Sequence, residues 1–136
     1  MNLTRRGLLG TAAATAAATT LPLGRARAAS GPTIKIGVLQ DLSGPYKDDG
    51  GPGTAACVRQ AVQEFGAKGF NVEVLMADHQ NKPDIGAGIA RQWIDRDGVT
   101  MIGGVSNSGV ALAVNNVCRE KNTVYVNTGA GTDDLT

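Results

Sequence analysis

Short apolar runs alternate along this chain with longer stretches of helical periodicity. The apolar runs are rich in β-branched residues and predict four strands, at residues 33–39, 71–77, 99–103 and 123–126. Apolar positions recur at helical spacing between them and predict three helices, at residues 53–68, 83–97 and 108–121. Alternation of strands and helices is typical of βαβ units, so the pattern predicts an α/β fold with a parallel sheet.

The connections between these elements predict how the strands are ordered. A β-helix-β crossover within one sheet is right-handed in nearly all cases. With the flavodoxin-like strand order 2-1-3-4, the first helix lies on one face of the sheet and the other two lie on the opposite face. Four strands and three helices are the opening of a doubly wound, Rossmann-like domain, so we expect residues 29–136 to be the first part of one lobe.

The first 28 residues differ in character from the rest. Arg5 and Arg6 precede an uncharged stretch rich in alanine and threonine, and Ala26-Arg27-Ala28 offers a small-x-small cleavage site. The middle stretch is too weakly apolar for a membrane span, which needs about 20 mostly apolar residues. The paired arginines favour the Tat route over the Sec route. We therefore predict a Tat-like signal peptide at residues 1–28 that is removed on export.

Charge narrows the class of partner. The leader holds four of the 13 basic residues and none of the 12 acidic ones, so the remainder has nine basic against 12 acidic residues, a net charge of −3. No cluster of lysine or arginine marks a surface for nucleic acid or anionic lipid. We therefore predict a small-molecule partner and no nucleic acid.

Cysteine and histidine give no sign of a metal centre. Cys57 and Cys118 fall on helices predicted to lie on opposite faces of the sheet, whereas a disulfide needs Cα atoms about 4.4 to 6.8 Å apart. We predict two unpaired thiols. His79 is the only histidine and has no partner at metal-ligand spacing, so we predict that it lies in a surface turn and that the chain binds no metal.

Three loops are predicted to leave the carboxyl ends of the strands, where ligands bind in open parallel sheets. In the loop at residues 104–108, Ser108 is predicted to cap the third helix, and Ser106 and Asn107 stand beside it. A helix N-terminus with nearby hydroxyl groups suits a carboxylate. Tyr46, in the loop at residues 40–52, can cover an organic ligand with its ring.

The same loops allow two other interpretations. Residues 104–108 come close to the G-x-S-x-G elbow, which would make Ser106 the nucleophile of a serine hydrolase. The second glycine is absent, however, and His79 precedes the serine instead of following it. Residues 51–56 match the G-x-G-x-x-A dinucleotide fingerprint, but eleven residues separate them from the strand and Pro52 removes a backbone donor. No cofactor is predicted.

Four segments, taken in order, resemble the start of the periplasmic substrate-binding proteins of ABC transporters of the branched-chain amino acid (Leu/Ile/Val-binding) type. They are IGVLQDLSGPY at 36–46, ADHQNK at 77–82, SNSGVALAV at 106–114 and NTGAGTDDLT at 127–136. The resemblance implies a periplasmic, non-enzymatic protein of two Rossmann-like lobes that close on a ligand and deliver it to an ABC permease in the inner membrane. The implied ligand is an amino acid or another small organic carboxylate, aromatic ones included.

The resemblance also implies which residues contact the ligand. In such proteins the loops matching Ser106-Asn107-Ser108 and Gly129-Ala130-Gly131 hold the carboxylate and the ammonium of the ligand, and the loop with Tyr46 lies close by. The threonine hydroxyl often found at the position of Gly131 is missing here. A sensory ligand-binding domain of the same fold remains a further alternative.

Overall fold

A parallel four-stranded sheet forms the centre of the molecule. The computed structural model describes residues 31–66 and 69–136, so the predicted signal peptide lies outside the described residues. The strands are β1 (Thr33–Gln40), β2 (Asn71–Asp78), β3 (Met101–Gly104) and β4 (Val124–Asn127), in the order β2-β1-β3-β4. All three pairings are parallel. The predicted fold class and strand order are confirmed.

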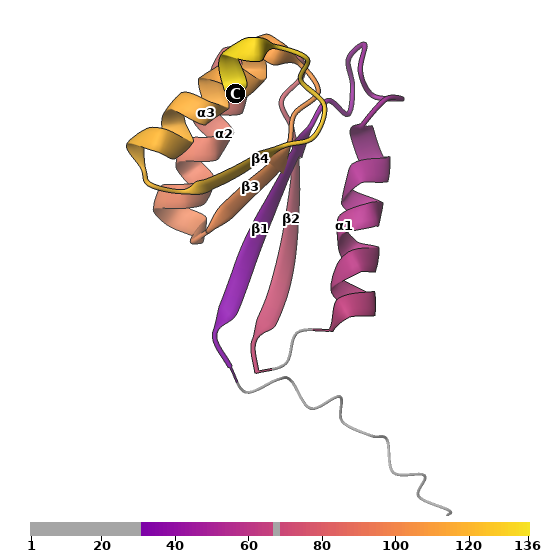
Figure 1. The fold of residues 1–136 in the computed structure, drawn as a ribbon, viewed down its shortest axis with the longest axis vertical. Coiled ribbons are helices and arrows are strands. Elements are labelled where there is room, and N and C mark those ends of the chain that lie inside the picture. The colour runs from indigo at the N-terminus through magenta and orange to yellow at the C-terminus, as the bar shows by residue number, and fades with distance from the viewer. Residues whose placement is uncertain (1–30, 67–68) are drawn as a thin grey trace, which may run out of the picture.

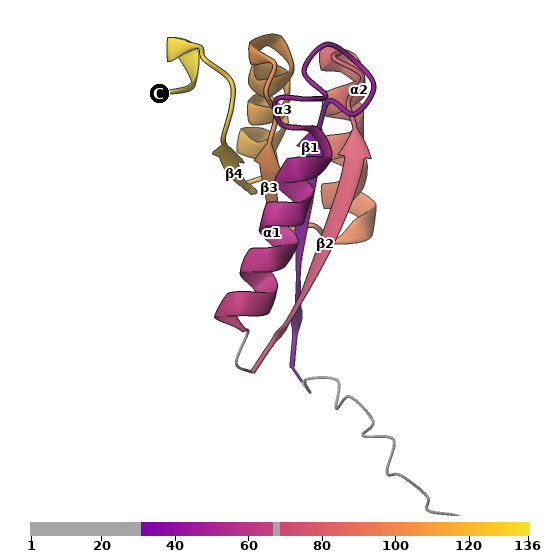
Figure 2. The ribbon, with the colours of Figure 1, turned by 90° about the vertical axis from the view of Figure 1, so that its right-hand side faces the viewer.

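Helices cover the two faces of the sheet unequally. They are α1 (Gly51–Phe65), α2 (Pro83–Gln92) and α3 (Ser108–Glu120), with a short 3-10 turn, η2 (Asp133–Leu135), near the end. Figure 1 shows α1 on one side of the strands and α2 with α3 on the other. In Figure 2 α1 lies nearest the viewer and the other two helices lie behind the strands. This is the arrangement that right-handed crossovers predict.

The main core lies between the sheet and the α2–α3 pair. Leu39 and Ile102 from the strands meet Val110 and Val114 from α3, all with no exposed surface. Trp93 is 5% exposed and packs so closely on β1 that a Cβ at Gly37 would lie 2.5 Å from its ring. Trp93 therefore serves packing in the core.

The end of the second helical segment is wound more loosely than a regular α-helix. After α2, one turn of π-helix, η1 (Trp93–Asp97), carries the chain to Gly98, which ends the helix with a left-handed φ of 72°.

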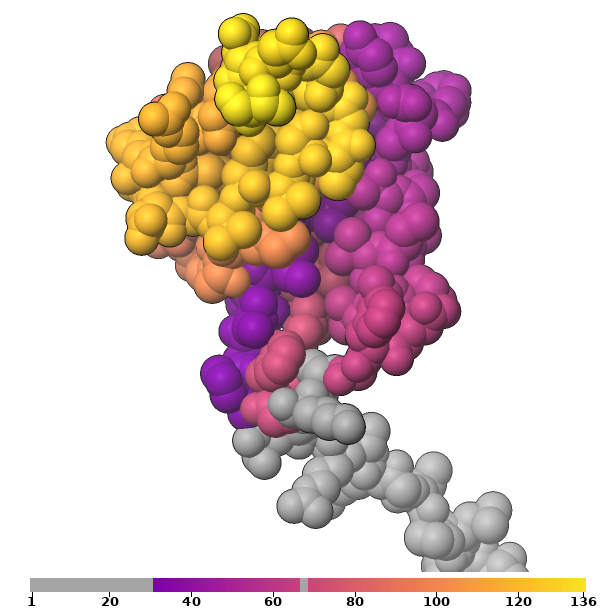
Figure 3. Space-filling view, in the orientation of Figure 1, coloured from indigo at the N-terminus to yellow at the C-terminus, as the bar shows by residue number. Residues whose placement is uncertain are grey.

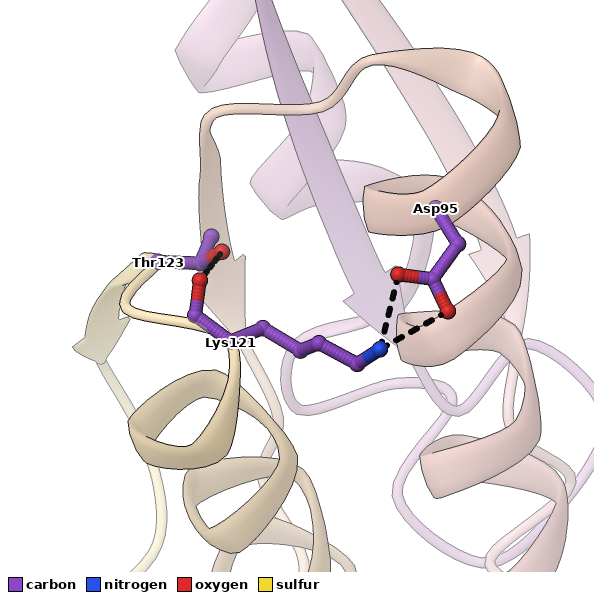
Figure 4. Close-up of polar contacts among 3 residues, drawn as sticks. All are labelled: Asp95, Lys121 and Thr123. Atoms are coloured by element: carbon purple, nitrogen blue, oxygen red, sulfur yellow. Dashed lines mark hydrogen bonds and ion pairs between the residues drawn. The ribbon is translucent and has the colours of Figure 1, made fainter.

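Figure 4 shows Asp95 of η1 paired with Lys121, just beyond α3, at 2.9 Å between Nζ and Oδ1. Both side chains are partly exposed, so this pair contributes less than about 1 kcal/mol. None of the helices in the described ranges is long and apolar enough to cross a membrane.

The bounds of the first helix and the start of the third strand differ most from the prediction. The first helix begins at Gly51, because Pro52 fits the first turn of a helix, and it ends at Phe65, with Gly66 as the C-cap. The third strand begins at Met101, since the N–H of Val99 donates to Trp93 O and completes the helix end. Alternate residues of β3 are only partly buried, so the two faces of this strand are covered unequally.

In the described part of the chain, no helix covers the β3–β4 half of one sheet face. Helix α1 packs on β1 and β2, while Met101, Val124 and Val126 on β3 and β4 face the same side. Val124 is 57% exposed and Val126 42%. In Figure 3 the indigo atoms of β1 are visible between α1 and the yellow atoms of the C-terminal segment. We call Met101, Val124 and Val126 the open sheet face.

Both cysteines are free thiols, as predicted, but they differ in accessibility. Cys57 is exposed on α1, whereas Cys118 is buried on α3 and burial raises its pKa to about 11. Because the thiolate is the reactive form, we expect one thiol to react rapidly with a disulfide reagent in the folded protein and the second only after denaturation. Stopped-flow thiol titration of wild type and Cys57→Ser would test this. Rapid reaction of Cys118 in folded Cys57→Ser would contradict it.

Candidate ligand-binding site

The loops that follow β3 and β4 lie against each other at the carboxyl edge of the sheet. A Cβ at Gly129 would lie 3.2 Å from the Cα of Ser106. The N–H of Thr128 also donates to Gly104 O at 3.3 Å. Ser106 and the glycine-rich loop are therefore brought together, as the sequence predicts. Gly131 lies further along that loop, and none of the described residues comes within 4 Å of the position a Cβ would take there.

Asn127, at the end of β4, organises both loops through its side-chain amide. Its Oδ1 accepts hydrogen bonds from the N–H groups of Gly129 and Ala130, at 3.2 and 2.9 Å. Its Nδ2 donates to Val105 O at 3.1 Å and to the hydroxyl of Tyr125. The N–H of Ala130 is therefore already bonded within the loop.

The start of α3 is capped by Asn107, so the prediction of Ser108 as the cap is wrong. Asn107 has extended backbone angles, and its Oδ1 accepts from the N–H of Val110 at 2.9 Å. A cap must stand one residue before the first helical residue, and the helix already includes Ser108. Helix geometry leaves the N–H groups of Ser108 and Gly109 without intrahelical acceptors. Within the described residues, Nδ2 of Asn107 also has no hydrogen-bond acceptor.

Val105, directly before Ser106, has an unusual backbone conformation. Its φ is 66°, in the left-handed region that β-branched residues rarely adopt, and its side chain is fully buried. Its N–H donates to Leu39 O at 2.9 Å and its carbonyl accepts from Asn127. Such strain persists only where surrounding contacts determine the conformation, and it concentrates at functional sites.

Two carboxylates from the strand ends hold the loop that carries Tyr46. The two oxygens of Asp41 accept from the N–H groups of Gly44 and Tyr46, at 2.7 and 3.0 Å, and Asp41 has no exposed surface. Asp78 accepts from the N–H of Leu42 at 3.0 Å. Tyr46 is 38% exposed, in a loop that these hydrogen bonds hold in place. Sequence reasoning missed this role of Asp41.

Hydrogen bonds also set the charge of Asp78. Burial by itself would raise the pKa of this carboxyl, but the hydrogen bonds it accepts from Leu42 N–H, Ser43 and Gln80 N–H favour the ionised form and bring the pKa below its usual value. Asp78 is therefore ionised at neutral pH and anchors the loop as a carboxylate.

Gln40 lies beneath the site and links α1 to the loop after β3. It is 2% exposed, its Nε2 donates to Thr54 Oγ1 at 3.0 Å, and its Oε1 accepts from Ser106 Oγ at 3.4 Å. From the sequence, Gln40 was predicted only to be the first residue of a loop. The signal that could have indicated its buried position is that it directly follows an apolar strand.

His79 is buried, so its predicted surface position is wrong. The turn after β2 does form there, with Gln80 and Asn81 in the left-handed region. The turn directs the imidazole inward, where Nδ1 accepts from the N–H of Asn81 at 3.0 Å and none of the described residues accepts from Nε2. A Cβ at Gly86 of α2 would lie 3.6 Å from the Cβ of His79. The described residues contain no group of three or more side chains that could hold a metal ion.

The buried imidazole predicts a loss of stability in mild acid. Burial lowers the pKa of His79 below 6.5, and the negative charges of Asp41 and Asp78 offset only part of this effect. The folded state therefore binds this proton less readily than the unfolded state does, so the stability is present above pH 6.5 and falls as the pH drops below it. We expect the free energy of unfolding in urea to decrease from pH 7.5 to pH 5.5.

His79→Asn is the matched variant for this test. Asparagine keeps an acceptor for the N–H of Asn81 but does not titrate. The unfolding free energy of the variant should therefore change less than that of wild type over the same pH range. Equal pH dependence in both proteins would show that His79 is not the responsible group.

The sequence and the fold of this chain are similar to those of known proteins. The family model described as periplasmic binding protein matches residues 33–136. The Leu/Ile/Val-binding protein homolog 3 of Brucella melitensis biotype 1 is 32% identical over 106 residues, which are 76% of this chain and 28% of that protein. The chain thus spans less than a third of the length of this relative.

Solved structures agree with this match. A periplasmic binding protein from Burkholderia mallei has 48% sequence identity and a TM-score of 0.73, over 76% of this chain and 28% of its own. A solute-binding protein of an ABC transporter from R. palustris, in complex with 4-hydroxybenzoate, has 27% identity and a TM-score of 0.66, over the same shares. The chain therefore belongs to the periplasmic binding protein family.

Proposed function

We propose that residues 29–136 are the first part of lobe 1 of an exported substrate-binding protein, preceded by a Tat-like signal peptide, that delivers a small carboxylate to an ABC permease. The ligand is an amino acid or another organic acid, aromatic acids included. The observation that carries the proposal is the contact of Gly129 with Ser106 at the carboxyl edge of the sheet, beside the N-terminus of α3. Bound ligands in open parallel sheets occupy this position.

The donors at this edge suit a carboxylate. The N–H groups of Ser108 and Gly109 lie at the positive end of the α3 dipole, and Nδ2 of Asn107 adds a third donor. Tyr46 supplies an aromatic ring from the loop after β1, and the loop with Ala130 and Gly131 supplies backbone groups. In this proposal the second lobe closes over the ligand, and closure requires contacts from both lobes. The described lobe alone should bind weakly.

The surroundings of Ser106 favour binding over hydrolysis. A serine nucleophile needs a general base within hydrogen-bond reach. The hydroxyl of Ser106 is bonded to the amide of Gln40, which cannot act as a base, and Nδ1 of His79 is bonded to the N–H of Asn81. The proposal therefore assigns Ser106 to ligand contact.

Calorimetry of the full-length protein with isoleucine and with 4-hydroxybenzoate tests the proposal. Asn107→Asp keeps the capping oxygen but replaces the Nδ2 donor with a second carboxylate oxygen, which repels a bound carboxylate. We expect this variant to weaken binding by at least about tenfold. Asn116→Asp makes the same charge change at an exposed position of α3 and should bind as wild type does. Equal affinity in both variants would place the carboxylate elsewhere.

A further inference from the structure

A groove lined by apolar side chains runs between the second half of α1 and the sheet. In α1 only Gly51 and Ala55, near its start, are buried, and Phe65 at its end is 87% exposed. The groove has a volume of about 370 Å³. We call it the α1 groove, and its main lining residues are Ile36, Val58, Val62, Phe65, Phe70 and Val72.

The chain that precedes β1 joins the domain at one end of this groove. A Cβ at Gly31, the first described residue, would lie 3.1 Å from the Cα of Phe70. The N–H of Asn71 donates to Pro32 O at 2.9 Å, which holds the two segments side by side. Figures 1 and 2 show the start of β1 and the end of α1 at the same end of the molecule. The preceding residues are therefore tethered beside the α1 groove.

The leader has the composition that suits such a groove. Residues 7–24 contain no charged side chain, and Leu21-Pro22-Leu23 is their apolar end nearest to the domain. Leu23 stands eight positions before Gly31, and a chain of that length can span about 26 Å. The groove follows only about two turns of helix, about 11 Å. The tether therefore reaches the whole groove and keeps the leader at a high effective concentration there.

The end of α1 also suits the charges of the leader. The last turn of this helix contains Glu64 and no basic residue, and the helix dipole places a partial negative charge at the same end. Arg25 and Arg27 stand between Leu23 and the domain in the sequence. With Leu23 in the groove, the two arginines would lie near this end of the helix, where cations are favourable.

We propose that, before export, the leader folds back onto the domain, with Leu21-Pro22-Leu23 in the α1 groove and the two arginines that follow at the C-terminal end of α1. The contact shields Phe65 from water and holds the cleavage site at Ala26-Arg27-Ala28 against the domain. Cleavage then requires release of the leader and uncovers the groove. The inference rests on the leader of the proposed function and not on its ligand.

Disulfide trapping in the full-length protein, purified with residues 1–28 attached, tests this contact. Cys57→Ser removes the exposed thiol and leaves Cys118 buried, and Leu23→Cys supplies a thiol in the leader. A second cysteine is placed in the groove with Val62→Cys or, as the matched control, on the outer face of the same helix with Gln60→Cys. Two positions along a helix differ by about 200° in direction. A leader without a fixed position would reach both thiols at similar rates.

We expect the disulfide between positions 23 and 62 to form at least about tenfold faster in a glutathione buffer than the disulfide between positions 23 and 60. Leu21→Asp places a charge where the groove is apolar and should bring the two rates together. Leu21 lies outside the sequence of the domain, so this loss of trapping cannot come from misfolding of the domain. Thermal unfolding shows that the Val62→Cys and Gln60→Cys variants are folded.

The outcomes separate the leader from other occupants of the groove. Faster trapping at position 62 that is lost in Leu21→Asp supports the inference. Equal rates at both positions would overturn it and leave the transport role intact. In full-length protein that begins at Ala29, a Val62→Cys thiol that resists a disulfide reagent would show that later parts of the chain cover the groove, which also overturns it. A dimer of that form that dissociates in Phe65→Asp would assign the groove to a second copy instead.

Discussion

Replacing Gly104 with alanine is expected to reduce the free energy of unfolding by about 3 kcal/mol. The φ of Gly104 is 100°, which is strained for any residue with a side chain. A Cβ there would also lie 2.8 Å from Nε2 of Gln40 and 2.9 Å from the carbonyl oxygen of Leu39. That carbonyl accepts from the N–H of Val105, so it cannot shift without disturbing the β1–β3 edge.

Gly98→Ala is the matched control for this substitution. Gly98 also has a left-handed φ, 72°, but none of the described residues lies within 4 Å of the Cβ position. The free energy of unfolding of Gly98→Ala should fall by only about 1 kcal/mol, the cost of a side chain at a left-handed φ. Urea denaturation of both variants measures the difference. If the two variants were equally stable, the close approach of Gln40 and Leu39 to Gly104 would have no energetic consequence.

Asp41→Ala is expected to destabilise the protein by about 2 to 4 kcal/mol and to loosen the Tyr46 loop. The substitution leaves the N–H groups of Gly44 and Tyr46 without their acceptor, and hydrogen bonds to a charged group contribute about 1.5 to 3 kcal/mol each. Asp78 still holds Leu42 at the start of the loop, so the loop should not detach completely. Hydrogen exchange at Gly44 and Tyr46 should accelerate more than exchange in α3.

Asp41→Asn provides the comparison. Asparagine has the same shape and retains one acceptor oxygen, so it should keep one of the two loop bonds and lose less stability. A result in which alanine is tolerated as well as asparagine would mean that the Tyr46 loop is held by other contacts.

The topology of this fold could be predicted from the sequence because it depends on local pattern and handedness. The runs that became β1 and β2 are bounded by turn residues, and right-handed crossovers left one arrangement for the helices. The site loops followed from the same reasoning, since the carboxyl ends of parallel strands share one edge. Contact between Ser106 and Gly129 was predictable at this level.

The side chains that organise the site could not be predicted in the same way. Gln40 and Asp41 read as loop residues because polar side chains are usually exposed, and only the tertiary fold encloses them. His79 was assigned to the correct turn, but the direction of its ring depends on two left-handed residues that follow it. Asn107 and Ser108 are both good caps, and a shift of one residue in the helix start decides between them.

The open sheet face has a consequence for how this chain can be handled. Parallel sheets are stable when both faces are shielded from water, and here valine side chains on the last strand are in contact with solvent. The backbone groups on the outer side of that strand can also pair with another strand. Residues 29–136 produced by themselves should therefore self-associate, and lysine at Val124 and Val126 should make them more soluble.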